Sequence, residues 1–136
     1  WSSQLTCWYH ENSWMHGLWV LFFSYKIDII ISSISVVNAV YIGRKHDSIK
    51  LKGNLSRLAE FVSFVDLPAS MVLETLKSDW ADYEDALQHA SALNNNVDCI
   101  VTRNKKDFKD SSLPIYTPEE LLENLIKQND GPTSWL

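Results

Sequence analysis

From residue 27 onward, segments typical of strands alternate with segments typical of helices, and this alternation limits the folds open to the chain. Residues 27–31 (Ile-Asp-Ile-Ile-Ile) are rich in β-branched side chains, as expected of a strand buried on both faces. Residues 99–102 resemble a second such strand, and shorter strands are expected at 64–67 and 115–116. Strands that alternate with helices are usually parallel. We therefore expect an α/β fold of three layers, with helices on both faces of a short, mostly parallel sheet.

Helices are predicted between these strands from start signals and apolar stripes. Ala86, Leu87 and Ala90 share one face of the clearest helix, residues 82–93. Another helix is expected after Thr117, because Thr-Pro-Glu-Glu supplies a cap, a proline at the first helical position and a glutamate three residues after the cap. Further helices are expected in residues 35–45 with Ser35 as cap, from Asp47 or Ser48 onward, and in residues 70–77.

The composition fits one globular domain. The chain has 136 residues, of which 46% are apolar and 21% charged, so it is long enough for a single core and unlike a disordered chain. Two cysteines are too few for a disulfide scaffold, and Cys99 lies in an apolar run, as a buried thiol of a cytoplasmic protein does. The apolar stretch 14–23 is about half of the ~20 residues that a membrane span needs. We therefore expect a cytoplasmic protein without a membrane segment.

The net charge of −5 bears on any nucleic-acid role. Proteins that bind RNA through bulk electrostatics usually carry a basic excess, because much of the affinity comes from neutralised phosphates. This chain has no such excess, so any RNA contact is expected to be local. One basic cluster contains Arg103, Lys105, Lys106 and Lys109, although such a cluster is also typical of a solvated surface.

Three parts are distinguished along the chain. Residues 1–26 hold four of the six tryptophans and show no regular period. Residues 27–127 carry the alternation of strands and helices and form the expected domain. Residues 128–136 contain Asn-Asp-Gly-Pro and are expected to fray.

Two segments resemble the PIN domain family, in particular its bacterial toxin-type members. Residues 78–88 have an acidic helix start followed by Glu-Asp-Ala-Leu-Gln. Residues 100–122 have a strand ending in Thr-Arg-Asn, an Asp-Phe turn and then Thr-Pro-Glu-Glu-Leu. A weaker likeness at residues 31–38 matches the segment in which many members place their second acid. The resemblance covers roughly residues 27–126.

The resemblance implies a metal-dependent endoribonuclease. In this family, acids at the strand ends bind one or two Mg²⁺ or Mn²⁺ ions, and the site hydrolyses single-stranded RNA. Such hard ions prefer oxygen ligands, lower the pKa of a bound water and stabilise charge on the scissile phosphate. The resemblance also implies a small protein antitoxin as partner and a homodimer.

The candidate site residues are carried over from the family motifs. Asp85, in the first turn of the helix 82–93, matches the acid that precedes Ala-Leu, although acids at a helix start also cap it and favour its dipole. Asp107 is either a fourth acid or a turn cap. The expected catalytic residues are Asp85, Asp107, Asn104 and Asn38; the expected metal ligands are Asp85, Asp107, Glu84 and Asp82; the expected RNA contacts are Arg103, Thr102 and Lys105.

Two features depart from the family pattern. Asn38 stands where the family usually has a glutamate, which removes a negative charge. PIN domains also open with an apolar strand ending in Asp-Thr-Asn, whose aspartate is the central metal ligand. Residues 1–26 contain no such sequence and one acid, Glu11, so the chain either begins after that strand or is out of frame there. If the strand is lacking, we expect a sheet without its central member and a weakly active or inactive protein.

Other functions are weighed beside the nuclease. A catalytically inactive PIN-like module that binds an antitoxin or another partner is the main alternative, because acids are missing. A different metal-dependent phosphoesterase would normally show Asp-x-Asp on its first strand, which this chain lacks. A dinucleotide-binding domain is not supported, because the four glycines form no phosphate-binding loop.

Overall fold

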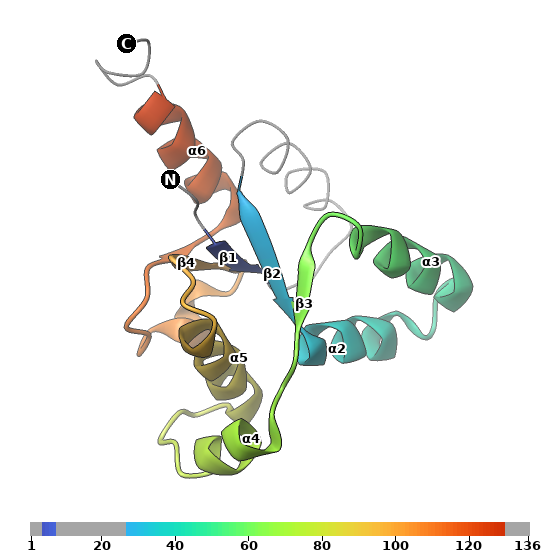
Figure 1. Cartoon of the computed structure of the whole chain (residues 1–136), viewed down its shortest axis with the longest axis horizontal. Helices are drawn as coiled ribbons and strands as arrows, with labels where there is room; N and C mark the ends of the chain where they lie inside the picture. Colours follow the sequence, from blue (N-terminus) through green and yellow to red (C-terminus); the bar gives the residue numbers. More distant parts are fainter. Residues whose placement is uncertain (1–3, 8–26, 130–136) are drawn as a thin grey trace.

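The computed structural model describes residues 4–7 and 27–129, which contain a five-stranded sheet (Figure 1). All neighbouring strands in this sheet run parallel, in the order β3-β2-β1-β4-β5. The strands are β1 (Gln4–Cys7), β2 (Asp28–Ser32), β3 (Ser63–Val65), β4 (Cys99–Val101) and β5 (Ile115–Tyr116). The α/β fold with a short parallel sheet is thus confirmed.

Five α-helices and one short 3₁₀ helix surround the described sheet. They are α2 (Ser33–Gly43), α3 (Ser48–Leu58), α4 (Ala69–Thr75), α5 (Tyr83–Asn94), η1 (Lys105–Phe108) and α6 (Pro118–Asn129). None of these helices is both long and apolar enough to cross a membrane. Each lies where the sequence predicts a helix or turn, with small shifts at the ends.

The helix starts follow local capping chemistry. The cap of α2 is Ser32 rather than the predicted Ser35, because Ser32 Oγ accepts a hydrogen bond from the Ser35 backbone N–H at 3.4 Å. Asp47 caps α3 by accepting from the Lys50 N–H at 3.0 Å. The chain leaves α5 through Asn96, whose φ of 53° lies in the left-handed region that asparagine tolerates.

The first strand corrects the sequence analysis. No family strand was recognised in residues 1–26, yet Gln4–Cys7 forms β1 in the middle of the sheet. Leu5 is in register with Ile29 of β2 on one side and with Cys99 of β4 on the other. The sheet therefore has a central strand, but the sequence of that strand, Gln-Leu-Thr-Cys, contains no carboxylate.

Other predictions for the opening and the end of the chain fall largely outside the described residues. These are the apolar stretch 14–23, the acid Glu11 and the fraying of residues 128–136, of which only the first two are described, as the end of α6. The division of the chain at residues 26 and 127 stays a prediction.

Apolar clusters cover both faces of the sheet. Successive residues of a strand point to opposite faces, and β2 follows this rule. Ile29 and Ile31 pack in one cluster with residues of α2, α3 and α6, whereas Ile30 packs in a second cluster with Ala92 of α5 and Phe108 of η1. Two covered faces are the usual setting of a parallel sheet.

The carboxyl ends of the parallel strands meet at one edge of the sheet. At this edge β2 leads directly into α2 (Figure 1). β4 is followed in the chain by η1. In open parallel sheets, ligands bind in the crevice outside the carboxyl ends of the strands. We therefore expect a functional site at this edge of the sheet.

Candidate active site

An acidic cavity of about 190 Å³ lies beyond the carboxyl end of β4. Residues from the start of α5, the end of β4 and η1 form its walls. They are Asp82, Glu84, Asp85, Thr102, Asn104, Asp107 and Phe108. Six of these seven are predicted site residues, which lie about 20 positions apart in the sequence and are brought together by the fold.

Asp82 and Asp85 are held in place by the start of α5. Asp82 is the N-cap of the helix, and its Oδ1 accepts a hydrogen bond from the Asp85 backbone N–H at 3.0 Å. Asp85 follows in the first turn and is only 8% exposed. The capping role thus belongs to Asp82, which leaves the carboxylate of Asp85 available to the cavity.

The Asp85 carboxyl group has an unusual acidity. Burial, followed by the negative charges of Asp82, Asp107 and Glu84, raises the pKa of Asp85 from 3.8 to about 7. Asp107 therefore lies close enough to influence Asp85, and its role as a fourth acid of the site stays a prediction. Four carboxylates this close repel one another, and a cation would relieve that repulsion.

The chain after β4 forms the opposite wall. Thr102 is 3% exposed, and its Oγ1 accepts a hydrogen bond from the Asn104 backbone N–H at 3.1 Å. This bond turns the chain at the strand end and brings Asn104 to the cavity. Phe108 is buried, and its ring packs edge-on against Trp80 at 5.9 Å between ring centroids.

Asn38 reaches the same region from α2. Its Nδ2 donates a hydrogen bond to Glu84 Oε1 at 2.5 Å. Asn38 therefore contacts one of the acids without lining the cavity itself, and its predicted catalytic role stays a prediction. An amide that donates to a carboxylate stabilises its charged form, which a glutamate at the same position would not do.

The predicted RNA contacts Arg103 and Lys105 point to other partners. Arg103 forms an ion pair with Glu119 at 3.2 Å, and Lys105 forms one with Glu120 at 2.8 Å. The hydrogen bond from Lys105 lowers the pKa of Glu120. Neither basic side chain lines the acidic cavity. Exposed ion pairs of this kind contribute little to stability, so both bases are free to bind another anion.

A group of buried polar residues between α2 and α5 was not predicted from the sequence. Ser32, Ser35 and Gln88 are hydrogen-bonded to one another between α2 and α5. Gln88 was quoted as part of a family motif but given no role. The available signal was its position, three residues after Asp85 on the predicted helix.

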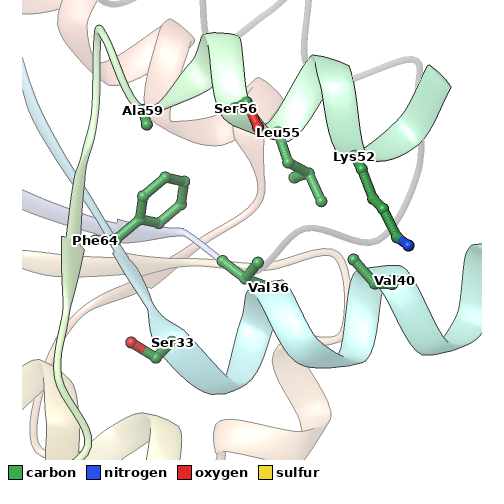
Figure 2. Close-up of a pocket in the computed structure, with 8 residues that line it drawn as sticks. All are labelled: Ser33, Val36, Val40, Lys52, Leu55, Ser56, Ala59 and Phe64. Atoms are coloured by element: carbon green, nitrogen blue, oxygen red, sulfur yellow. The ribbon is translucent and has the colours of Figure 1, made fainter. Parts of the chain in front are cut away.

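A second, apolar pocket lies on another part of the molecule. Its volume is about 480 Å³. Figure 2 shows the side chains that line it, which come mainly from α2, α3 and β3. They are Ser33, Val36, Val40, Lys52, Leu55, Ser56, Ala59 and Phe64. The pocket contains no carboxylate, amide or histidine, so its chemistry suits an apolar surface rather than catalysis.

The residues of the acidic cavity fit a divalent cation in donor chemistry. All of its polar side chains offer oxygen, which Mg²⁺ and Mn²⁺ prefer. Among the described residues, however, no three His, Cys, Asp or Glu side chains form a group that could hold a metal ion. The arrangement suits a hydrated ion held by one or two carboxylates, the usual manner of Mg²⁺, better than a closed cage.

A comparison with protein families decides the identity of the fold. A model of the PIN domain family matches residues 16–106. The chain belongs to the PIN domain family. The resemblance found in the sequence motifs is thereby confirmed, and PIN domains are generally nucleases that use divalent metals.

Solved structures with this fold agree. VapBC2 from Rickettsia felis, solved with a DNA fragment from its promoter, matches this PIN domain with a TM-score of 0.58 and 20% identity, covering 82% of this chain and 96% of the other. A Pyrobaculum aerophilum protein matches with a TM-score of 0.67 and 15% identity, covering 93% and 91%. A toxin–antitoxin complex from Klebsiella pneumoniae matches with a TM-score of 0.55 and 18% identity, covering 85% and 98%. No curated protein sequence matches this chain. At these identities the structural likeness concerns the fold.

Proposed function

We propose that this PIN domain is a metal-dependent endoribonuclease that hydrolyses single-stranded RNA at the acidic cavity. The observation that carries the proposal is Asp85, a buried carboxyl group whose pKa of about 7 results from burial and from three neighbouring acids. Perturbed acids in a cavity are typical of functional sites. Capping does not explain the other three acids, because Asp82 supplies the cap of α5.

Asp85 and Asp107 would hold the ion, which we propose to be Mg²⁺ or Mn²⁺. When bound, the ion would supply an activated water and stabilise negative charge on the phosphate. Asn104 offers an amide oxygen at the cavity wall, in a position fixed by Thr102. Glu84 is a further carboxylate of the cavity, and its Oε1 accepts a hydrogen bond from Asn38.

RNA would approach along the wall formed after β4. Arg103 and Lys105 follow the strand closely and bind surface glutamates, Glu119 and Glu120. We propose that a phosphate replaces these glutamates as the partner of both bases, because exposed ion pairs are weak. Such local contact agrees with the net charge of −5.

The test is cleavage of a generic single-stranded RNA by the purified protein with Mn²⁺, with and without EDTA. Asp85→Ala is compared with Asp28→Ala, because Asp28 is an exposed acid at the opposite end of the sheet. We expect cleavage that needs Mn²⁺, is lost in Asp85→Ala and persists in Asp28→Ala. Equal activity of the two variants would exclude Asp85 as the central acid. Activity in EDTA would exclude metal dependence.

A small protein antitoxin is the partner that we propose for this nuclease in the cytoplasm. Support comes from the matched fold in a toxin–antitoxin complex from Klebsiella pneumoniae.

The predicted homodimer remains part of the proposal. Light scattering after gel filtration would measure the mass in solution, and a monomer at high concentration would remove the homodimer.

An inactive binding module is a second candidate, and two observations favour it. The central strand β1 contains no carboxylate, and Asn38 provides an amide where the resemblance expects an acid. Calorimetry with Mn²⁺ separates the candidates. A folded protein that neither binds Mn²⁺ nor cleaves RNA would be the binding module.

A further inference from the structure

Three buried polar side chains lie where α2 and α5 meet, next to the acidic cavity. Ser32, Ser35 and Gln88 are 0%, 2% and 3% exposed. Ser32 ends β2 and caps α2, Ser35 lies in the first turns of α2, and Gln88 lies one turn after Glu84 on α5. Polar groups buried to this degree are costly unless each one finds a partner.

The hydrogen bonds of these side chains close into a ring. The Ser32 hydroxyl donates to Gln88 Oε1 at 2.6 Å, and Gln88 Nε2 donates to Ser35 Oγ at 2.9 Å. The two serine oxygens lie 3.1 Å apart. Because the one hydroxyl proton of Ser32 is given to Gln88, the Ser35 hydroxyl donates to Ser32 Oγ. Each member therefore donates one bond within the ring and accepts one, so that the bonds strengthen one another.

The side-chain amide of Gln88 is what closes the ring. The ring needs a donor and an acceptor together at the end of a side chain of this length. Methionine has a similar length without the donor, a glutamate carboxylate offers acceptors alone, and asparagine is one methylene shorter.

The ring joins two helices that the apolar core does not join. α2 packs in one core cluster and α5 in the other, and within the part of the chain that the structure describes neither cluster contains residues of both helices. Past the end of β2, the helices are linked by the ring and by the bond from Asn38 to Glu84. Ser35 and Asn38 are three residues apart on α2. Glu84 and Gln88 are four apart on α5, so both links use one face of each helix.

We propose that Gln88 is a positioning residue for the acidic cavity. By closing the ring, it fixes the first turns of α5 against α2 and thereby holds Glu84 against Asn38. A catalytic effect of the position of Glu84 rests on the nuclease function proposed above. The contact between Glu84 and Asn38 does not depend on that function. Groups that orient metal-binding side chains typically change metal affinity about 10- to 100-fold when they are removed.

Gln88→Met is the first variant, because it keeps the length of the side chain and removes both hydrogen bonds of the amide. The readout is the side-chain amide of Asn38 in proton–nitrogen NMR spectra. Its bond to Glu84 shifts this signal and slows its exchange with water. In Gln88→Met we expect the signal and the exchange rate of a solvent-exposed asparagine.

Ser91→Ala is the matched control. Ser91 lies on the same helix and is 1% exposed, but its hydroxyl oxygen has no hydrogen-bond partner among the described residues. The substitution thus removes a buried hydroxyl without breaking a bond. We expect the Asn38 signal to stay at its wild-type position in this control.

Ser35→Ala opens the same ring by a smaller change and decides the question if Gln88→Met does not fold. An unchanged Asn38 signal in either folded variant would overturn the proposal. In calorimetry we also expect an about tenfold loss of Mn²⁺ affinity in both variants, and none in Ser91→Ala. If the wild-type protein binds no Mn²⁺, the nuclease proposal fails, while the NMR comparison still tests the role of Gln88.

Discussion

Among single residues, Asp85 shows most directly how the fold changes a side chain's chemistry. An aspartate at a helix start is ordinarily exposed, where it stabilises the helix dipole as an anion. Here burial and the neighbouring acids raise the pKa to about 7, so that the protonated form persists close to neutral pH. Near neutral pH this carboxyl group can therefore release its proton and bind a cation instead.

The raised pKa predicts how stability depends on pH. Between about pH 4 and pH 7 the folded protein binds a proton at Asp85 that the unfolded chain releases. This group therefore stabilises the fold at low pH, and its contribution is lost as pH rises through that range. Asp85→Asn should remove that part of the slope in urea unfolding measured between about pH 4 and pH 8. Identical slopes for Asp85→Asn and wild type would contradict the shift, and Asp28→Asn serves as the exposed control.

At the scale of elements, the start of α5 combines a structural and an electrostatic role in Asp82. Its carboxylate caps the helix and also adds to the repulsion at Asp85. α3 offers a cap of the same chemistry in Asp47, far from the cavity in sequence. Substitutions at Asp82 and at Asp47 can therefore separate the capping role of Asp82 from its effect on the charge of Asp85.

Asp82→Ala should destabilise the protein by about 1 kcal/mol, the usual effect of losing such a cap. It should also lower the pKa of Asp85, because one of the neighbouring negative charges is removed. Asp47→Ala should lower the stability by a similar amount and leave the pKa of Asp85 unchanged. Urea unfolding measures the first effect and NMR titration of the Asp85 carboxyl the second. A changed pKa of Asp85 in both variants would instead indicate that loss of stability, and not loss of the Asp82 charge, causes the change.

The elements differ in how far the sequence reveals them. The run of isoleucines in β2 and the capped, striped sequence of α5 follow from period and start signals alone. β1 was missed because its four residues contain one β-branched side chain and are too few for their alternation of polar and apolar residues to indicate a strand. Its place comes from hydrogen bonds to β2 and β4 on either side, which no local pattern announces.

At the scale of the whole molecule, stability depends on the two clusters that cover the sheet. Ile100 of β4 is 2% exposed in one of them, whereas Ile49 on α3 is 83% exposed. Ile100→Ala should lower the free energy of unfolding by about 2–5 kcal/mol, because it leaves a cavity. Ile49→Ala should change it by less than about 0.5 kcal/mol. Similar losses in urea unfolding would show that the second cluster is not a packed core.

The residues of the acidic cavity could be predicted from family motifs. The hydrogen bonds that hold the cavity in place could not. Asp85, Asn104 and Asp107 stand in short motifs whose order and spacing indicated one site. The bond from Asn38 to Glu84 and the ring around Gln88 join residues about 50 positions apart. Such pairs depend on how α2 and α5 meet past the sheet edge, which is a property of the packed molecule.

The order of the strands has a consequence for how the chain is made. β1 is the sole bridge between the pair β3-β2 and the pair β4-β5 in the described sheet. β1 precedes the other described strands in the chain, yet its neighbour β4 is synthesised nearly a hundred residues later. Contacts between such distant segments form slowly. β1 therefore keeps one edge unpaired until β4 has been made, and β5 then extends the sheet at its rim.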